Sequence, residues 1–366
     1  MKIGILTFHN ALNFGATLQA YALCEYLKCG GHQAEIINYL NPKTKKEIGL
    51  FYSRTDEGIS DRLLRYCNLP ARLKSIKSYR RFFNENMTLS GNIISTAEEL
   101  SLLCEKYDKI IVGSDQIFNY NGTGEDFNFY LDFLRDNNKK TAYAPSFGLK
   151  EVDGEHYDRV KRCLLDFNSL SAREQSGVEI IKKLTGTDVP LVCDPTFLLD
   201  KNQWCKIAAK PKISKPYILI YSFGSRHLDR YAEQLAKQKN AISVNINRAI
   251  PCFGKGRKNI YGISPAEFLG LILNADHIVT CSFHGMVLSI VFEKDFTLYK
   301  NEYPSAENTN LRFDSLAETL SLQDRIKCLG APPCTEPIDY KSVNKAVSAW
   351  RKQSTAYIKS ALGEDL

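Results

Sequence analysis

The sequence has no run of about 18 apolar residues, the length that a helix needs to cross a bilayer, and we therefore predict no transmembrane helix. Residues 1–7 read as a first buried strand and lack the pattern of a secretory signal peptide. None of the 11 cysteines forms a Cys-x-x-Cys pair, and most lie in apolar stretches. This usage is typical of reduced, buried thiols, so we expect a cytoplasmic protein.

Several ligand signatures are also missing. No cluster of His, Cys, Asp and Glu has metal-ligand spacing, so we expect neither a metal nor a resident cofactor. The loop after the first strand is not Gly-x-Gly-x-x-Gly, which excludes the dinucleotide fingerprint. The net charge of +7 weakly favours anionic ligands or surfaces. Because zinc-finger spacing and RNA-recognition signatures are absent, we expect no nucleic acid partner.

What is present indicates two ordinary globular domains. The chain has 366 residues, of which 44% are hydrophobic and 24% charged. Strand and helix patterns alternate in both halves, which predicts an α/β fold with parallel sheets. We place an N-terminal α/β domain at residues 1–200, with a helical insertion at about 43–90, and a C-terminal α/β domain at 201–335. The remaining residues, 336–366, read as a long helix that packs back toward the N-terminal domain.

A strongly basic stretch lies inside the predicted insertion. Residues 62–83 carry seven basic residues and no acid, interleaved with aromatic and aliphatic side chains. The basic residues are Arg62, Arg65, Arg72, Lys74, Lys77, Arg80 and Arg81. Such a pattern suits an anionic membrane surface or an anionic lipid carrier. The alternative is a solvated pair of basic helices.

The strongest candidate site is the stretch 278–292, where a β-branched run turns directly into an apolar helical pattern. Ser282 is placed to cap the helix, and His284 falls in its first turn. Unpaired N–H groups and the positive end of the helix dipole favour a phosphate or carboxylate at such a corner. The alternative is a histidine packed at an ordinary strand-to-helix turn.

Three further places could present polar groups at strand ends. Arg173 precedes a helix and could clamp an anion in bidentate fashion, or form a surface ion pair with Glu174 or Glu179. Asp115 and Gln116 follow a buried strand. Asp115 could act as a base, accept a hydrogen bond from a sugar hydroxyl or form an Asx turn.

The loop after the first strand holds the third set. Asn10, Asn13 and Gly15 could contact a polar substrate or serve only as turn formers.

Taken in order, these segments resemble the polysaccharide pyruvyl transferase family. The resemblance covers roughly residues 1–320, and its motifs are specific through their order and spacing. The segments that carry it are Asn10 with residues 13–23, Val112-Gly113-Ser114-Asp115-Gln116 with Asn119, Ser171-Ala172-Arg173-Glu174, Asp194-Pro195-Thr196, Ser282-Phe283-His284-Gly285 and Asn310-Leu311-Arg312. Two departures are Phe118, where the family often has another aromatic, and residues 43–90, which match nothing in the family.

The resemblance implies two Rossmann-like domains facing across a cleft, as in GT-B glycosyltransferases. It implies phosphoenolpyruvate as donor, a sugar diol as acceptor, and a cyclic pyruvate ketal as product. By the same resemblance the catalytic residues are His284, Arg173 and Asp115. The donor residues are Arg173, Ser282, Phe283, His284, Gly285 and Arg312. The acceptor residues are Asn10, Asn13, Gly15, Asp115 and Gln116.

The basic stretch 62–83 leads us to expect a lipid-diphosphate-linked glycan, a precursor of a capsule or exopolysaccharide, at the inner face of the cell membrane. Two rival functions share the architecture. One is a GT-B glycosyltransferase that uses a nucleotide sugar, and the other is a non-catalytic glycan- or anion-binding protein.

Overall fold

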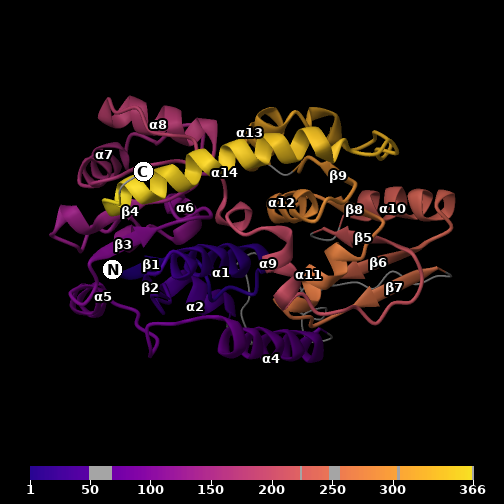
Figure 1. The fold of residues 1–366 in the computed structure, drawn as a ribbon, viewed down its shortest axis with the longest axis horizontal. Helices are drawn as coiled ribbons and strands as arrows, with labels where there is room; N and C mark the ends of the chain where they lie inside the picture. Colours follow the sequence, from indigo (N-terminus) through magenta and orange to yellow (C-terminus); the bar gives the residue numbers. More distant parts are fainter. Residues whose placement is uncertain (49–67, 223–224, 247–255, 303–305, 365–366) are drawn as a thin grey trace. The chain divides into compact units, whose positions relative to one another are not determined.

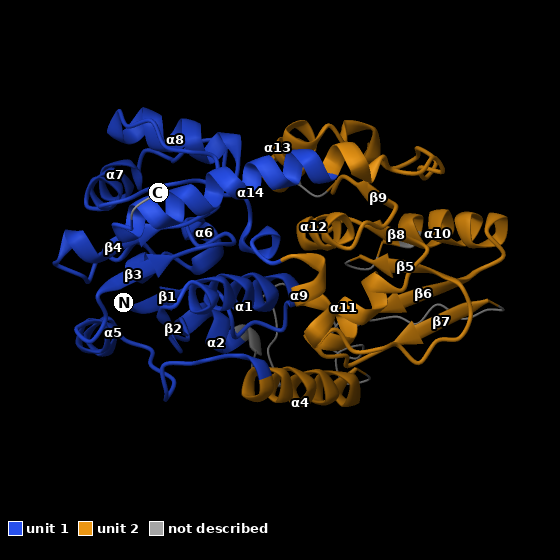
Figure 2. Ribbon diagram, viewed as in Figure 1, with its two compact units in different colours: residues 1–46, 86–199, 344–366 blue, residues 47–85, 200–343 orange. Residues whose placement is uncertain are grey.

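The computed structural model describes residues 1–48, 68–222, 225–246, 256–302 and 306–364 (Figure 1). The chain divides into two compact units (Figure 2). Unit 1 comprises Met1–Lys46, Asn86–Leu199 and Asn344–Leu366, and unit 2 comprises Glu47–Glu85 and Asp200–Val343. Most of the stretch 43–90, predicted as an insertion in the first domain, thus groups with unit 2.

Unit 1 is built on a parallel four-stranded sheet with the order β2-β1-β3-β4. Its strands are β1 (Lys2–Leu6), β2 (Gln33–Ile36), β3 (Lys109–Val112) and β4 (Lys140–Ala142). Ile5 pairs with Ile36 on one side and with Ile111 on the other. All three side chains are buried, as expected for a parallel sheet that is covered on both faces.

The first helix of unit 1 begins and ends at local signals in the sequence. The Asn13 side chain accepts from the N–H groups of Gly15 and Ala16 and so caps the first helix, which ends at Gly30. The helices are α1 (Phe14–Cys29), α2 (Pro42–Ile48), α5 (Ala97–Cys104), α6 (Tyr120–Thr123), α7 (Tyr157–Leu165) and α8 (Gln175–Thr185). Three 3-10 turns complete the unit, at η1 (Phe127–Tyr130), η2 (Asn137–Lys139) and η3 (Pro195–Phe197).

Unit 2 holds a parallel six-stranded sheet with the order β10-β9-β8-β5-β6-β7. The strands are β5 (Tyr217–Tyr221), β6 (Ile242–Ile246), β7 (Arg257–Ile260), β8 (His277–Thr280), β9 (Phe296–Tyr299) and β10 (Ile326–Lys327). The two outermost strands, β10 and β7, show little of the apolar strand pattern in their sequences. β7 reads Arg-Lys-Asn-Ile, and its residues are exposed or half-buried at the edge of the sheet, so it lacks the apolar run of a buried strand.

Helices α10 (Arg226–Gln238) and α12 (Phe283–Val291) pack against the strands of this sheet. The other helical segments of unit 2 are α4 (Leu69–Asn86), α9 (Lys201–Ile207), α11 (Pro265–Leu273), α13 (Ala306–Leu320) and the 3-10 turn η4 (Gln323–Arg325). Helix α11 begins at a clear local signal, because Ser264 and Glu267 form a capping box and Pro265 follows the cap.

Helix α4 belongs to unit 2 through specific contacts. The Ser78 hydroxyl donates to the carbonyl of Gly262 at 2.9 Å. Gly262 lies so close to the Lys74 stem that a Cβ there would collide with it. Tyr79 and Phe82 are buried. These contacts explain why α4 groups with unit 2, although segments of unit 1 precede and follow it in the chain.

The last helix, α14 (Tyr340–Leu362), begins in unit 2 and continues through unit 1. Several hydrogen bonds tie its unit 1 part to that unit, and one of them runs from Arg351 Nε to the carbonyl of Phe197. Trp350 Nε1 donates to the carbonyl of Leu191, and Tyr357 donates to the carbonyl of Ala142. Ser354 Oγ accepts from the backbone N–H of Cys193. Over the described part of the chain, no helix combines the length and the hydropathy that crossing a membrane requires.

Candidate functional site

The corner between β8 and α12 lies at the carboxyl edge of the unit 2 sheet. Thr280 Oγ1 donates to the carbonyl of Tyr221 at 2.7 Å and accepts from the N–H of Ser282 at 3.0 Å. A Cβ on Gly285 would overlap this same hydroxyl. Thr280 therefore holds the corner, and the close approach of helix to strand requires glycine at position 285.

Ser282 occupies the N-cap position, as predicted, but its side chain forms no capping hydrogen bond. The first intrahelical bond runs from Met286 N–H to Ser282 O. The N–H groups before it lie at the positive end of the helix, whose first turn contains no acidic residue. This geometry suits an anionic group, which agrees with the interpretation of the sequence.

His284 lies in this first turn with a side chain that is mostly buried, since the residue is 6% exposed. The Phe283 ring meets the imidazole edge-on, with 5.4 Å between ring centroids. The Arg312 guanidinium stands 5.5 Å from the Phe283 ring centroid. The structure thus brings the predicted donor residues of unit 2 together, namely Ser282, Phe283, His284, Gly285 and Arg312.

Two asparagines form hydrogen bonds next to the corner between β8 and α12. Asn310 Oδ1 accepts from the N–H of Asn301 at 3.0 Å, and Asn310 Nδ2 donates to the carbonyl of Asn301 at 3.1 Å. Asn301 Nδ2 in turn donates to the carbonyl of Cys281 at 3.3 Å. The sequence named Asn310 only as part of a motif and offered no signal for Asn301, which follows a strand without any marked pattern.

Arg173 lies at the carboxyl edge of the unit 1 sheet, inside a cluster of carboxylates. Its Nη1 contacts Asp194 Oδ2 at 2.8 Å, its Nε lies 3.6 Å from Glu174 Oε2, and its Nη2 lies 3.8 Å from Asp115 Oδ1. Burial alone would lower the pKa of the guanidinium, but these carboxylates outweigh it and raise the pKa above its ordinary value. The ion pair with Glu174 that the sequence suggested exists, but it is buried.

This cluster bears on the predicted role of Arg173 as a donor clamp. The side chain is 1% exposed. Its single positive charge faces three carboxylates, so an arriving anion would compete with them for the guanidinium. The donor role of Arg173 stays a prediction, and it would require the cluster to rearrange. Asp194, which the sequence marked only as part of a motif, is the nearest partner of Arg173.

Asp115 is the most accessible carboxylate of this cluster, with 14% of its side chain exposed. Its backbone is left-handed, with φ of 62°. Its carboxylate accepts from the N–H of Gln116 at 2.9 Å, and its carbonyl accepts from Ser146 N–H. A non-glycine residue held in this conformation at a strand end is strained, and such strain concentrates at functional positions.

The loop after β1 shows clear structural roles. Asn13 caps α1, Gly15 is buried in the first turn of that helix, and Asn10 Nδ2 donates to Asn38 Oδ1 at 3.2 Å. Their predicted contact with substrate stays a prediction. His9, which no sequence pattern marks, is buried in the same loop and contacts the carbonyl of Thr7 and Asn38 Oδ1. Burial lowers the pKa of its imidazole.

The candidate residues therefore form two sets. Arg173, Asp115 and the Asn-rich loop belong to unit 1, and the residues around His284 belong to unit 2. Within the described ranges, no three His, Cys, Asp or Glu side chains are grouped so as to hold a metal ion.

Comparisons with known proteins bear on both family and fold. A family model described as "Polysaccharide pyruvyl transferase" matches residues 13–303. No curated protein matches the chain in sequence. A putative UDP-N-acetylglucosamine 2-epimerase from Listeria monocytogenes is similar in structure, with a TM-score of 0.51 and 12% identity over 100% of this chain and 99% of that one. At this identity the likeness concerns the fold alone.

Two other structures are similar at lower scores. The glycosyltransferase SnogD from Streptomyces nogalater has a TM-score of 0.47 and 11% identity over 99% of this chain and 98% of its own. A UDP-GlcNAc 2-epimerase from Neisseria meningitidis has a TM-score of 0.45 and 9% identity over 99% of this chain and 94% of its own. The α/β fold with two parallel-sheet domains, which the sequence predicted, is confirmed and is GT-B-like.

Proposed function

The chain belongs to the polysaccharide pyruvyl transferase family, and from this membership we propose that it moves the pyruvyl group of phosphoenolpyruvate onto a sugar diol. The product is a cyclic pyruvate ketal, and phosphate is released. The observation that carries the proposal is the family match over residues 13–303, which spans every candidate residue except Asn10 and Arg312. It spans both the Arg173 cluster and the His284 corner.

The His284 corner would receive the donor. The N–H groups at the start of α12 and the Arg312 guanidinium suit its phosphate or carboxylate. His284 lies in that turn and is the side chain of the set best suited to proton transfer, because histidine is the most frequent general acid or base in enzymes. Asp115 and Gln116 of unit 1 would serve the sugar, with Asp115 accepting a hydroxyl proton.

The reaction balances without a redox partner. A proton adds to C3 of phosphoenolpyruvate, and one sugar hydroxyl oxygen bonds to C2 and loses its proton to a base. The second hydroxyl then bonds to C2 while the bond from C2 to the phosphate oxygen breaks. Phosphate leaves with the electron pair, and the second hydroxyl proton is taken up by a base or by phosphate. The net change in the glycan is the gain of pyruvate less water.

The test replaces His284 with Gln, which keeps a polar side chain but cannot transfer the proton. We expect the rate of pyruvate transfer from phosphoenolpyruvate to the glycan to fall by about 10²-fold or more. Mass spectrometry of the product and phosphate release measure this rate. The matched control is His227→Gln, because His227 is an exposed histidine on α10 of the same unit. Activity of His284→Gln within a few-fold of the unaltered protein would remove this histidine from catalysis.

The rival functions differ in the ligand that they bind. A bound ligand raises the apparent melting temperature of the protein. We expect phosphoenolpyruvate to raise it and a panel of nucleotide sugars to leave it unchanged. The reverse result would favour a glycosyltransferase, whereas stabilisation by glycans without any phosphate release would favour a binding protein.

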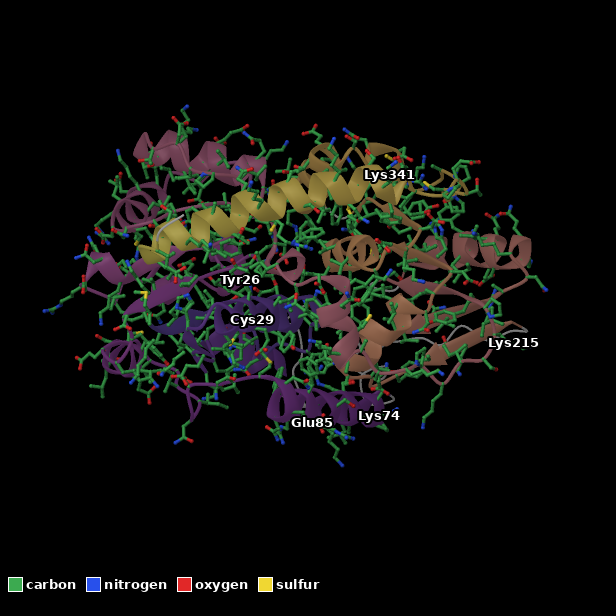
Figure 3. The ribbon with its side chains drawn as sticks, viewed as in Figure 1. Tyr26, Cys29, Lys74, Glu85, Lys215 and Lys341 are labelled. Carbon is green, nitrogen blue, oxygen red and sulfur yellow. The ribbon has the colours of Figure 1, made fainter. Side chains whose placement is uncertain are left out.

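For the acceptor we propose a lipid-diphosphate-linked glycan at the cytoplasmic face of the membrane, approached through α4. Exposed cations line this helix at Lys74, Lys77, Arg80 and Arg81, and its one acid, Glu85, pairs with Arg81 at 2.7 Å. Figure 3 shows Lys74 and Glu85 on this helix. Arg62 and Arg65 of the predicted basic stretch lie outside the described residues.

Vesicle binding tests this contact. Each Lys or Arg at an anionic surface contributes about 1 kcal/mol, so Lys77→Gln with Arg80→Gln should weaken binding to phosphatidylserine vesicles roughly 30-fold. Neutral vesicles should not bind. The control is Lys182→Gln with Lys183→Gln on α8, which removes the same charge from exposed positions in unit 1. Equal binding by the two double variants would show that α4 does not face the membrane.

A further inference from the structure

Two side-chain amides converge over a glycine at the carboxyl edge of the unit 1 sheet. A Cβ on Gly148 would overlap Gln116 Nε2 and would lie 3.1 Å from Asn119 Nδ2. Gly148 also has a left-handed backbone, with φ of +57°. The absence of a side chain at this position is therefore what allows the two amide groups to approach the same point, and any other residue would push them apart.

The amides retain free hydrogen-bonding capacity. Asn119 Oδ1 accepts from the N–H of Gly122 at 2.8 Å and so caps α6. This bond identifies the oxygen of the amide, so the atom that lies near the Gly148 Cβ position is Nδ2. Among the residues that the structure describes, Asn119 Nδ2 donates to no protein atom and the Gln116 amide has no hydrogen-bond partner. Both residues are half-buried, so the groups are open to a ligand.

The neighbouring charge selects the kind of ligand. Asp115 precedes Gln116 and belongs to the cluster in which three carboxylates surround Arg173. The carboxylates would repel an anion, and the N–H groups of the amides, which are hydrogen-bond donors, would disfavour a cation. A neutral hydroxyl group satisfies both partners, because its oxygen accepts from an amide N–H while its hydrogen goes to a carboxylate.

We propose that Asn119 and Gln116, converging over Gly148, bind adjacent hydroxyl groups of a sugar beside Asp115. The assignment of this sugar as the acceptor rests on the proposed function. Asn119 is then a residue that determines specificity. A sugar without the matching hydroxyl would leave its N–H groups unpaired, which is the strongest form of discrimination that a polar site offers.

Asn119→Asp separates the structural role of this residue from the binding role. The aspartate keeps the oxygen that caps α6 and replaces the N–H donors with an acceptor. We expect binding of methyl β-galactopyranoside and methyl α-mannopyranoside, measured by ligand-observed NMR, to weaken at least tenfold for whichever sugar binds. Their fully O-methylated forms should not bind. Asn121→Asp introduces the same charge at an exposed position two residues away and should leave binding unchanged.

Gly148→Ala tests the convergence itself. Its methyl group would displace the Gln116 amide, so the same loss of sugar binding is expected. Gly186→Ala is the matched control, because Gly186 also has a positive φ, of +77°, but nothing lies within 4 Å of its Cβ position. Sugar binding by Gly148→Ala equal to that of Gly186→Ala would overturn the proposal, as would equal losses for Asn119→Asp and Asn121→Asp.

Kinetics distinguish this site from the proposed function. If the protein is a pyruvyl transferase, Asn119→Asp should raise the KM for the glycan and leave the KM for phosphoenolpyruvate unchanged. A rise confined to the KM for phosphoenolpyruvate would refute the site. If no phosphate is released with any acceptor but sugar binding still falls in Asn119→Asp alone, the proposed function fails and the binding site stands.

Discussion

Acid should weaken unit 2 through one buried histidine, His277, which opens the strand that ends at the His284 corner. His277 is 1% exposed, and its Nε2 lies 3.0 Å from Thr297 Oγ1. That hydroxyl oxygen already accepts from the N–H of Cys334, so its hydrogen is available to the imidazole. Burial, aided by the positive charges of Lys239 and Arg325, lowers the pKa of His277 from 6.5 to about 3.

The sign and size of the effect follow from this pKa. The folded protein keeps His277 neutral, whereas the unfolded chain takes up a proton as the pH falls below 6.5. The stabilisation is therefore complete above pH 6.5 and is lost progressively as the pH falls toward 3. One pKa unit corresponds to about 1.4 kcal/mol, so acidification from pH 6.5 to about 5 should lower the free energy of unfolding by about 2 kcal/mol.

Urea unfolding at pH 7.5 and pH 5 measures this loss. Trp204 lies in unit 2 and Trp350 in unit 1, and the chain has two tryptophans, so fluorescence in a Trp350→Phe background reports on unit 2. His277→Gln should lose about 2 kcal/mol less than the unaltered protein between these two pH values. His227→Gln, at an exposed position, should behave like the unaltered protein. Equal acid losses with and without His277 would refute the reasoning.

Two further substitutions test the corner and the carboxylate cluster. Gly285→Ala should destabilise unit 2, because overpacking against Thr280 costs about 1–3 kcal/mol while the gain in helix propensity is about 1 kcal/mol. A higher melting temperature would contradict this. Asp194→Asn should cost unit 1 about 3–5 kcal/mol, because it removes the charge closest to a buried guanidinium. A loss below about 1 kcal/mol in urea unfolding would show that the other carboxylates already suffice.

Local patterns in the sequence predicted much of the fold. The helix expected within residues 336–366 is α14, a long amphipathic segment, and short apolar runs form strands such as β3, β6 and β9. The alternation of strands and helices predicted two parallel sheets, and the corner at Ser282 was placed correctly. These features depend on neighbours along the chain, which a single sequence displays.

Features that depend on distant partners could not be predicted in this way. The sequence left two roles open for Arg173, an anion clamp or a surface ion pair, because nothing in its surroundings along the chain reveals that Asp115 and Asp194 meet it. The Asn119 amide likewise lies close to Gly148, which belongs to the loop after the next strand, β4, so the sequence around Asn119 does not reveal this contact. Hydrophobic periodicity tells which face of an element is buried, but it does not tell which loops meet at the end of a sheet.

The route of the chain through the two units constrains how the protein can be made. The chain passes from unit 1 to unit 2 and back twice, and its final segment, Asn344–Leu366, completes the unit that begins at Met1. During synthesis on the ribosome, unit 1 thus has to wait for the last residues before it can close. A protein ending at residue 343 would leave the Leu191 carbonyl and the Cys193 N–H without Trp350 and Ser354. Neither unit can be produced as one contiguous fragment.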